Sequence, residues 1–205
     1  VGQEEYCQKE IVEHYGFQKV SHVIAGGKER YDSVYAGLLC CQDTDYVYIH
    51  DGARPLISSA LINANISCVQ EKEACITAVP AKDTIKVADN KGYVADTPDR
   101  SKLWQIQTPQ TFSYELIYQA YRVLITSEEN TAEPEQTLPY DSLLNKQKVK
   151  KLQENRGQVH VTDDAMVVEL LTDIPVKLVR GSYQNIKITT PEDLKIAEAL
   201  CEKKQ

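Results

Sequence analysis

The chain has 205 residues, of which 42% are hydrophobic and 26% are charged, values that suit one globular domain and exclude disordered, fibrous and collagen-like chains. The net charge of -7 argues against a nucleic-acid partner, because nucleic-acid interfaces need clustered positive charge. No apolar run approaches the roughly 18 residues of a membrane span, and the first residues do not resemble a signal peptide. Six cysteines without a CxxC pair indicate reduced thiols. We therefore expect a cytoplasmic protein that does not bind a membrane.

The first part of the chain alternates between helical and strand patterns. Apolar residues at helical spacing predict a helix over 3–15, and the run 19–25 has the composition of a strand. A second helical stripe precedes a strand over 46–50, and a third helix, capped by Ser58, leads to a buried strand over 74–79. This alternation predicts an α/β fold with a mostly parallel sheet, in which ligands bind beyond the carboxyl ends of the strands.

The pattern changes after residue 80. Two short β-rich runs flank residues 90–92, and this hairpin signal predicts a projecting β-hairpin arm over about 82–103. A helix from Ser113 comes next. The weakly hydrophobic stretch at about 127–156 is interpreted as a surface insertion, and its basic run 146–151 as a solvated helix face.

Beyond the insertion the chain returns to alternating elements. Residues 162–164 place a capping residue and two acids before an apolar helical stripe. The runs 176–180 and 186–188 predict the last strands. A capping Thr190, followed by proline at the first helical position, predicts the final helix.

Charged residues gather where the predicted strands end. Asp51 ends its strand in a turn, where a carboxylate serves either as a turn former or as a ligand for Mg²⁺ with a bound phosphate. Lys187 lies between two isoleucines on a predicted strand, so its ammonium must reach a cleft or an acidic partner. Any single cation is more often an ordinary surface charge. The cations in this arrangement are Lys28, Arg30, Arg54, Arg100 and Lys187.

Seven short motifs follow one another along the chain. They are 26–34 (GGKERYDSV), 50–55 (HDGARP), 82–86 (KDTIK), 97–100 (TPDR) with Leu103 and Trp104, 107–112 (QTPQTF), 162–165 (TDDA) and 185–194 (NIKITTPEDL). In this order they closely resemble the 2-C-methyl-D-erythritol 4-phosphate cytidylyltransferase family of the non-mevalonate isoprenoid pathway. A single motif would be weak, but seven in register argue against coincidence. The insertion alone lies outside the resemblance.

The resemblance implies a Rossmann-like, three-layer nucleotidyltransferase fold, with residues 1–205 forming a single cytidylyltransferase domain. The family transfers a cytidylyl group from CTP to methylerythritol phosphate, and pyrophosphate leaves with the help of Mg²⁺. Because such transfers depend on positioning and charge stabilisation, they require Lys, Arg and a metal rather than a nucleophile. The resemblance also implies a homodimer that interlocks through the hairpin arms.

The resemblance assigns roles residue by residue. The expected catalytic residues are Arg100 and Lys187, which would orient the attacking phosphate, with Arg100 reaching in from the arm of a second subunit. Asp51 matches the position of the metal ligand. For Thr108 and Thr162, a local turn and a helix cap are equally good explanations. The positions expected to bind CTP and Mg²⁺ are Gly27, Lys28, Ser33 and Asp51, and those expected to contact the substrate are Arg54, Thr84, Thr108 and Thr162.

The sequence departs from the family pattern at its beginning. Family members start with a strand and a glycine-rich loop that wraps the CTP triphosphate, and this sequence starts after both. We therefore expect the encoded protein to have an upstream segment, and the chain to be nearly inactive without it. Two alternatives stay open: a cytidylyltransferase for another polyol phosphate, such as ribitol 5-phosphate, and a non-catalytic nucleotide-binding protein.

Overall fold

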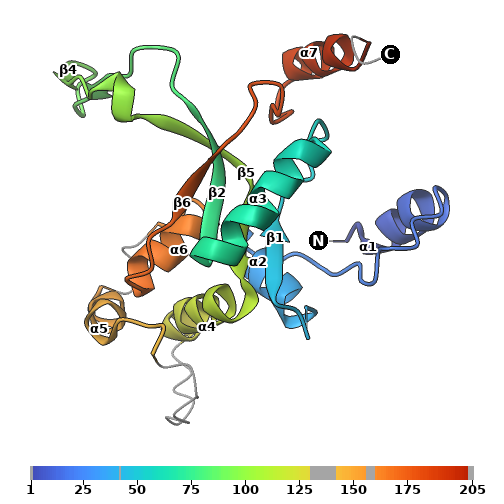
Figure 1. Ribbon diagram of the computed structural model, residues 1–205, viewed down its shortest axis with the longest axis horizontal. Coiled ribbons are helices and arrows are strands. Elements are labelled where there is room, and N and C mark those ends of the chain that lie inside the picture. The colour runs from blue at the N-terminus through green and yellow to red at the C-terminus, as the bar shows by residue number, and fades with distance from the viewer. Residues whose placement is uncertain (1, 42, 130–141, 156–159, 203–205) are drawn as a thin grey trace. The chain divides into compact units, whose positions relative to one another are not determined.

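The computed structural model describes residues 2–41, 43–129, 142–155 and 160–202 (Figure 1). In these residues the chain is an α/β protein with a four-stranded sheet in the order β1-β5-β2-β6 and a separate pair of strands, β3 and β4. The strands are β1 Tyr46–Ile49, β2 Ala74–Pro80, β3 Val87–Ala88, β4 Val94–Asp96, β5 Trp104–Ser113 and β6 Lys177–Arg180. The helices are α1 Glu4–Tyr6, η1 Cys7–Glu13, α2 Arg30–Leu39, α3 Ser59–Lys72, η2 Arg100–Lys102, α4 Tyr114–Glu129, α5 Lys146–Glu154, α6 Asp164–Leu171 and α7 Pro191–Glu202.

The chain divides into two compact units. Unit 1 comprises Val1–Val47 and Phe112–Pro175, and unit 2 comprises Tyr48–Thr111 and Val176–Gln205, so that the boundaries fall within β1 and β5. This division describes where contacts concentrate, and the single domain expected from the sequence stays a prediction.

In unit 1, helices α2, α5 and α6 pack around α4. This helix contacts α2, α5 and α6, because its apolar residues recur every three or four positions along one face. Tyr121, the largest of them, is fully buried. Fully burying an aliphatic side chain such as Leu116 contributes roughly 1.5–3 kcal/mol to folding. The other buried residues of α4 include Leu116, Ile117, Ala120 and Leu124, and those of α6 include Ala165, Val167, Val168 and Leu171.

Unit 2 is built on β2, whose sequence ACITAVP is buried throughout except at its last residue. β2 runs parallel to β6, with Cys75 opposite Lys177 and Ala78 opposite Arg180. Helix α3 covers these two strands and begins where the Ser58 side chain accepts a hydrogen bond from the Leu61 amide. The parallel pairing of β2 and β6 confirms this part of the predicted sheet. The core cluster between α3 and the strands consists of Leu61, Val69, Cys75 and Val179.

The predicted hairpin is confirmed. β3 and β4 pair antiparallel, with Val87 opposite Asp96. The connecting turn contains Gly92 at a φ of +84°, a conformation that glycine adopts without strain. The Asp89 carboxylate accepts hydrogen bonds from two amides of the same turn, which fixes its shape.

Three elements differ from the sequence-based expectations. Residues 19–25 and 186–188 were expected to be strands, but the structure places them in no strand. Their composition favours an extended backbone, yet a strand also requires a neighbouring strand to which it hydrogen-bonds. β5 was not expected, because Pro109 and several polar residues interrupt its apolar pattern. The helix expected over 3–15 is confirmed as α1 and η1, and the final helix as α7.

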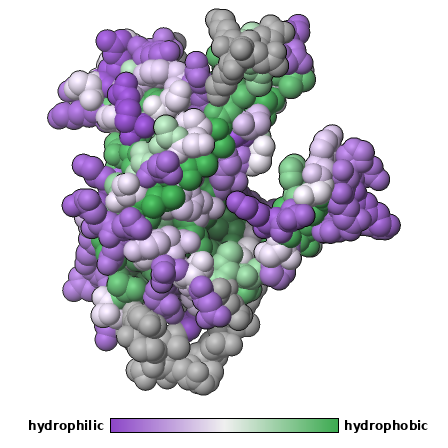
Figure 2. Space-filling model, turned by 45° about the vertical axis from the view of Figure 1, so that its right-hand side comes forward, coloured by the Kyte–Doolittle hydropathy of each residue, from purple (hydrophilic) through white to green (hydrophobic). Residues whose placement is uncertain are grey.

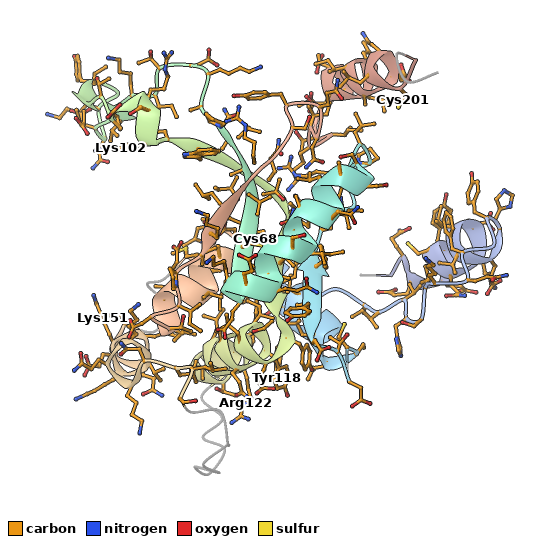
Figure 3. All side chains as sticks on the ribbon, in the orientation of Figure 1. Cys68, Lys102, Tyr118, Arg122, Lys151 and Cys201 are labelled. Carbon is orange, nitrogen blue, oxygen red and sulfur yellow. The ribbon has the colours of Figure 1, made fainter. Side chains whose placement is uncertain are left out.

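The described residues include free cysteines and several exposed hydrophobic side chains. The six cysteines are free thiols, among them Cys68 on α3 (Figure 3). Hydrophobic residues also reach the surface, where they are green in Figure 2, and Tyr93 of the hairpin is 71% exposed. In the described part of the chain, no helix combines the length and apolar character needed to cross a membrane.

Candidate active site

One carboxylate and two cations meet beyond the carboxyl end of β1. Asp51 Oδ2 lies 3.1 Å from Lys187 Nζ and 3.4 Å from Arg54 Nε. The side chains of Asp51 and Arg54 are 16% and 11% exposed, whereas that of Lys187 is 46% exposed. The structure thus confirms that Lys187 has an acidic partner. Because two cations face one carboxylate, the three groups carry a net positive charge, which favours an anionic ligand.

Hydrogen bonds to backbone carbonyls bring these three residues together although Lys187 is distant in sequence. The Arg54 amide donates to the Asp51 carbonyl at 2.9 Å and closes the turn after β1. The Ile188 amide donates to the Ala53 carbonyl at 2.8 Å. Arg54 Nη1 also donates to the Asn185 carbonyl at 2.8 Å. The segment after β6 is therefore bound to this turn, and Lys187 is placed beside Asp51.

Thr108 on β5 supports the same turn from another strand. Its hydroxyl oxygen lies 3.0 Å from the Asp51 amide and 2.9 Å from His50 Nδ1. Asn185 Nδ2 donates to the Thr108 carbonyl at 2.8 Å. Thr108 lies within β5 instead of in the local turn considered from the sequence. His50 and Asn185 are site residues to which the sequence assigned no role, although both lie in the motifs quoted above.

A second group of predicted residues lies in unit 1, before α2. The Gly27 amide donates to Ser33 Oγ at 2.9 Å, and the Ser33 hydroxyl is 3.3 Å from the Glu29 carbonyl. A Cβ atom on Gly27 would lie 2.1 Å from the Asp32 Cβ, so a larger residue does not fit here. Lys28 is exposed on this turn. The structure thus brings Gly27 and Ser33 together at the start of α2.

Arg30, the first residue of α2, is bound to the start of α6. Its guanidinium forms two hydrogen bonds with Asp164, at 2.8 and 2.6 Å, and the Tyr121 hydroxyl donates to the same carboxylate at 2.5 Å. Asp164 is fully buried, while Arg30 is 39% exposed. Burial first, and then the Asp164 charge, raises the pKa of the Tyr121 hydroxyl, so that it remains a neutral donor. Arg30 therefore links the Gly27 turn to the segment that contains Thr162.

The structure also locates Thr162, Arg100 and Thr84. The N-cap of α6 is Asp163, whose carboxylate accepts from the Met166 amide at 3.0 Å, so the cap considered for Thr162 is made by its neighbour. Arg100 Nη1 donates to the Lys82 carbonyl at 2.9 Å, at the base of the arm in unit 2. Thr84 is exposed between β2 and β3.

A pocket of about 610 Å³ in unit 1 has none of the predicted site residues among those that line it. Its walls come from α5 and α6 and include Lys151, which projects from α5 (Figure 3). The basic run 146–151 was expected to be a solvated helix face. Lys148 of this run instead forms hydrogen bonds within the protein, because its ammonium donates to the carbonyls of Glu169 and Thr172. In this way α5 satisfies carbonyl groups at the end of α6.

Solved structures that resemble the chain include cytidylyltransferases, which are nucleotidyltransferases. The crystal structure of 4-diphosphocytidyl-2C-methyl-D-erythritol synthase from Anaerococcus prevotii matches with a TM-score of 0.73 and 32% identity, over 98% of this chain and 75% of that one. The 2-C-methyl-D-erythritol 4-phosphate cytidylyltransferase from Thermus thermophilus matches with a TM-score of 0.64 and 26% identity, over 91% and 78%.

The sequence comparisons identify the family more specifically than the structural comparisons do. The family model of 2-C-methyl-D-erythritol 4-phosphate cytidylyltransferase (IspD) matches residues 3–136 and 131–203. A protein of that name from Lachnoclostridium phytofermentans is 45% identical over 207 aligned residues, which cover 100% of this chain and 76% of that protein. The chain belongs to the 2-C-methyl-D-erythritol 4-phosphate cytidylyltransferase family. The nucleotidyltransferase fold inferred from its motifs is thereby confirmed.

Proposed function

We propose that the protein transfers a cytidylyl group from CTP to 2-C-methyl-D-erythritol 4-phosphate. An oxygen of the sugar phosphate attacks the α-phosphorus of CTP, and the bond to the β-phosphate breaks. The products are 4-diphosphocytidyl-2-C-methyl-D-erythritol and pyrophosphate. The observation that carries this proposal is the Asp51–Arg54–Lys187 cluster, which joins two cations beside one carboxylate in a chain of this family.

The three side chains of the Asp51–Arg54–Lys187 cluster differ in their exposure to solvent, and therefore in how easily they can contact a substrate. Lys187 is the most exposed of the three, so its ammonium can leave Asp51 in part and stabilise charge on the reacting phosphates. Arg54 is largely buried and donates to the Asn185 carbonyl, so it contributes a fixed positive charge. In unit 1 the Gly27 turn, stiffened by Ser33, is the proposed site for the cytosine base and ribose.

Mg²⁺ is the proposed cofactor, and Asp51 is the residue that would hold it. No group of three or more His, Cys, Asp or Glu side chains within the described ranges is arranged to hold a metal. A single carboxylate, that of Asp51, fits Mg²⁺. This ion usually binds one or two protein carboxylates and takes its other ligands from water and substrate phosphates. When bound, Mg²⁺ would neutralise charge on the phosphates and on the leaving pyrophosphate.

The experiment that tests the proposed function is pyrophosphate release from CTP and Mg²⁺ by the purified protein, expressed from its whole gene so that any segment upstream of residue 1 is included. One reaction contains methylerythritol phosphate and the other contains ribitol 5-phosphate. Release with methylerythritol phosphate, lost after addition of EDTA and restored by excess Mg²⁺, is the expected result. A preference for ribitol phosphate would assign the chain to the other polyol phosphate, and no release with either substrate would favour a non-catalytic role.

The hairpin arm supports a homodimer. It exposes several hydrophobic side chains, including Tyr93 at 71% and Val94 at 62%. Exposed apolar residues that cluster on one element often mark a contact with another protein. Arg100 lies at the base of this arm, where it donates to the Lys82 carbonyl. We propose that the arm binds a second copy of the chain and brings Arg100 to the partner's sugar phosphate.

Mixing two inactive variants tests this arrangement. Arg100→Ala and Lys187→Ala should each have low activity when alone, because each removes one cation from every site. After subunit exchange, half of the dimers carry one intact site, so about a quarter of the original activity should return. No recovery in a mixture whose subunits demonstrably exchange would show that both residues act within one chain.

A further inference from the structure

The imidazole of His50 joins two segments that hold the Asp51 turn. Its Nε2 atom lies 3.0 Å from the Arg54 carbonyl oxygen, and its Nδ1 atom lies 2.9 Å from the Thr108 hydroxyl. His50 is exposed, whereas Thr108 is 5% exposed. The ring thus spans from the end of the turn to a buried residue of β5.

The partners of the two ring nitrogens define the tautomer of the neutral imidazole. A carbonyl oxygen accepts hydrogen bonds and donates none, so Nε2 must carry the hydrogen. Nδ1 is then an acceptor, and the Thr108 hydroxyl donates to it. The Thr108 oxygen in turn accepts from the Asp51 amide at 3.0 Å. The resulting chain of hydrogen bonds runs from the Asp51 amide through Thr108 and His50 to the Arg54 carbonyl.

This chain fixes both ends of the turn that carries the charged cluster. Asp51 begins the turn and Arg54 ends it, and the side chains of these two residues lie 3.4 Å apart. We propose that His50, with hydrogen on Nε2, is a positioning residue that holds Asp51 and Arg54 in their reactive arrangement through its hydrogen bonds to Thr108 and to the Arg54 carbonyl. Thr108 then acts first as a structural link, with one lone pair left to accept a bond from substrate.

A kinetic test distinguishes the two hydrogen bonds that the His50 ring forms. This test rests on the proposed function. His50→Phe keeps a flat ring and removes both bonds, and kcat should fall about tenfold because misplaced catalytic groups slow the reaction. KM for CTP should change little. His50→Gln retains a donor near the Nε2 position and His50→Asn an acceptor near the Nδ1 position, so each should recover part of kcat. His14→Phe, which changes an exposed histidine of the N-terminal helical segment, is the matched control and should keep full activity.

A spectroscopic test does not require turnover. Long-range ¹H–¹⁵N spectra report which ring nitrogen carries hydrogen, and for His50 we expect the Nε2–H form, because Nε2 faces the Arg54 carbonyl oxygen. Thr108→Val should increase hydrogen exchange at the Asp51 amide, while Thr108→Ser should preserve its protection. An Nδ1–H tautomer, or unchanged exchange in Thr108→Val, would overturn the proposal even if the protein proved inactive. In an active protein, His50→Phe with unaltered kcat, or with a loss confined to KM, would also overturn it.

Discussion

Replacing Lys187 with alanine should lower turnover about a hundredfold, which corresponds to about 2.7 kcal/mol of lost transition-state stabilisation. The ammonium lies 3.1 Å from Asp51 Oδ2 and is exposed enough to meet a substrate phosphate. Its removal leaves Asp51 with less positive charge nearby, so that the site attracts phosphates less strongly. The measurement is steady-state pyrophosphate release, with kcat and both KM values determined for the variant and the unaltered protein.

Two further variants make the Lys187 result specific. Lys187→Arg keeps the positive charge but changes its geometry, so it should retain more activity than Lys187→Ala. Lys195→Ala removes an exposed lysine from α7 and should leave the rate unchanged. A Lys187→Ala rate within twofold of the original would exclude this ammonium from the chemistry.

Replacing Asp164 with alanine should cause the largest loss of stability, about 3 kcal/mol of the free energy of unfolding. The fully buried Asp164 carboxylate accepts two hydrogen bonds from Arg30 and one from Tyr121, and its removal leaves the buried Tyr121 hydroxyl without this acceptor. The melting temperature should fall by about 6–12 °C for a chain of this size. Thermal unfolding followed by circular dichroism measures both quantities.

One milder change at the same site and one change at an exposed ion pair elsewhere provide a scale for that result. Tyr121→Phe removes one hydrogen bond to a charged group, so its cost should be about 1.5–3 kcal/mol. Glu5→Ala breaks the exposed Lys9–Glu5 pair, which spans 2.7 Å, and should change the free energy of unfolding by less than about 0.5 kcal/mol. If Asp164→Ala proved as mild as Glu5→Ala, the triad of Arg30, Tyr121 and Asp164 would not contribute to stability as the contacts indicate.

Local signals in the sequence predicted several elements correctly. Ser58 caps α3, as expected from its place before an apolar helical stripe. The turn at 90–92 connects an antiparallel pair, and Pro191 begins α7. Each of these signals acts between residues that are neighbours in sequence. For that reason propensity and spacing were sufficient to predict them.

β5 shows where local signals were insufficient. Its sequence WQIQTPQTFS has no regular alternation and includes Pro109, but the strand lies between β1 and β2 in the sheet order. Two of its polar residues, Gln107 and Thr111, tolerate burial because each has a distant partner. Gln107 Nε2 donates to the Ser182 carbonyl at 2.9 Å, and Thr111 Oγ1 lies 3.4 Å from Asn65 Oδ1. These partners could not be inferred from the sequence around β5.

The sequence by itself determined the family, through seven motifs in register, and the identity of the charged residues in the candidate site. Only the tertiary structure showed which of them form ion pairs. Lys187 and Arg54 both pair with Asp51, and Arg30 pairs with Asp164. The physical reason is that ion pairs and strand ladders depend on distance in space, and the partners here come from segments far apart in the chain. Sequence patterns record which residues can take part in such interactions, and folding selects the partners.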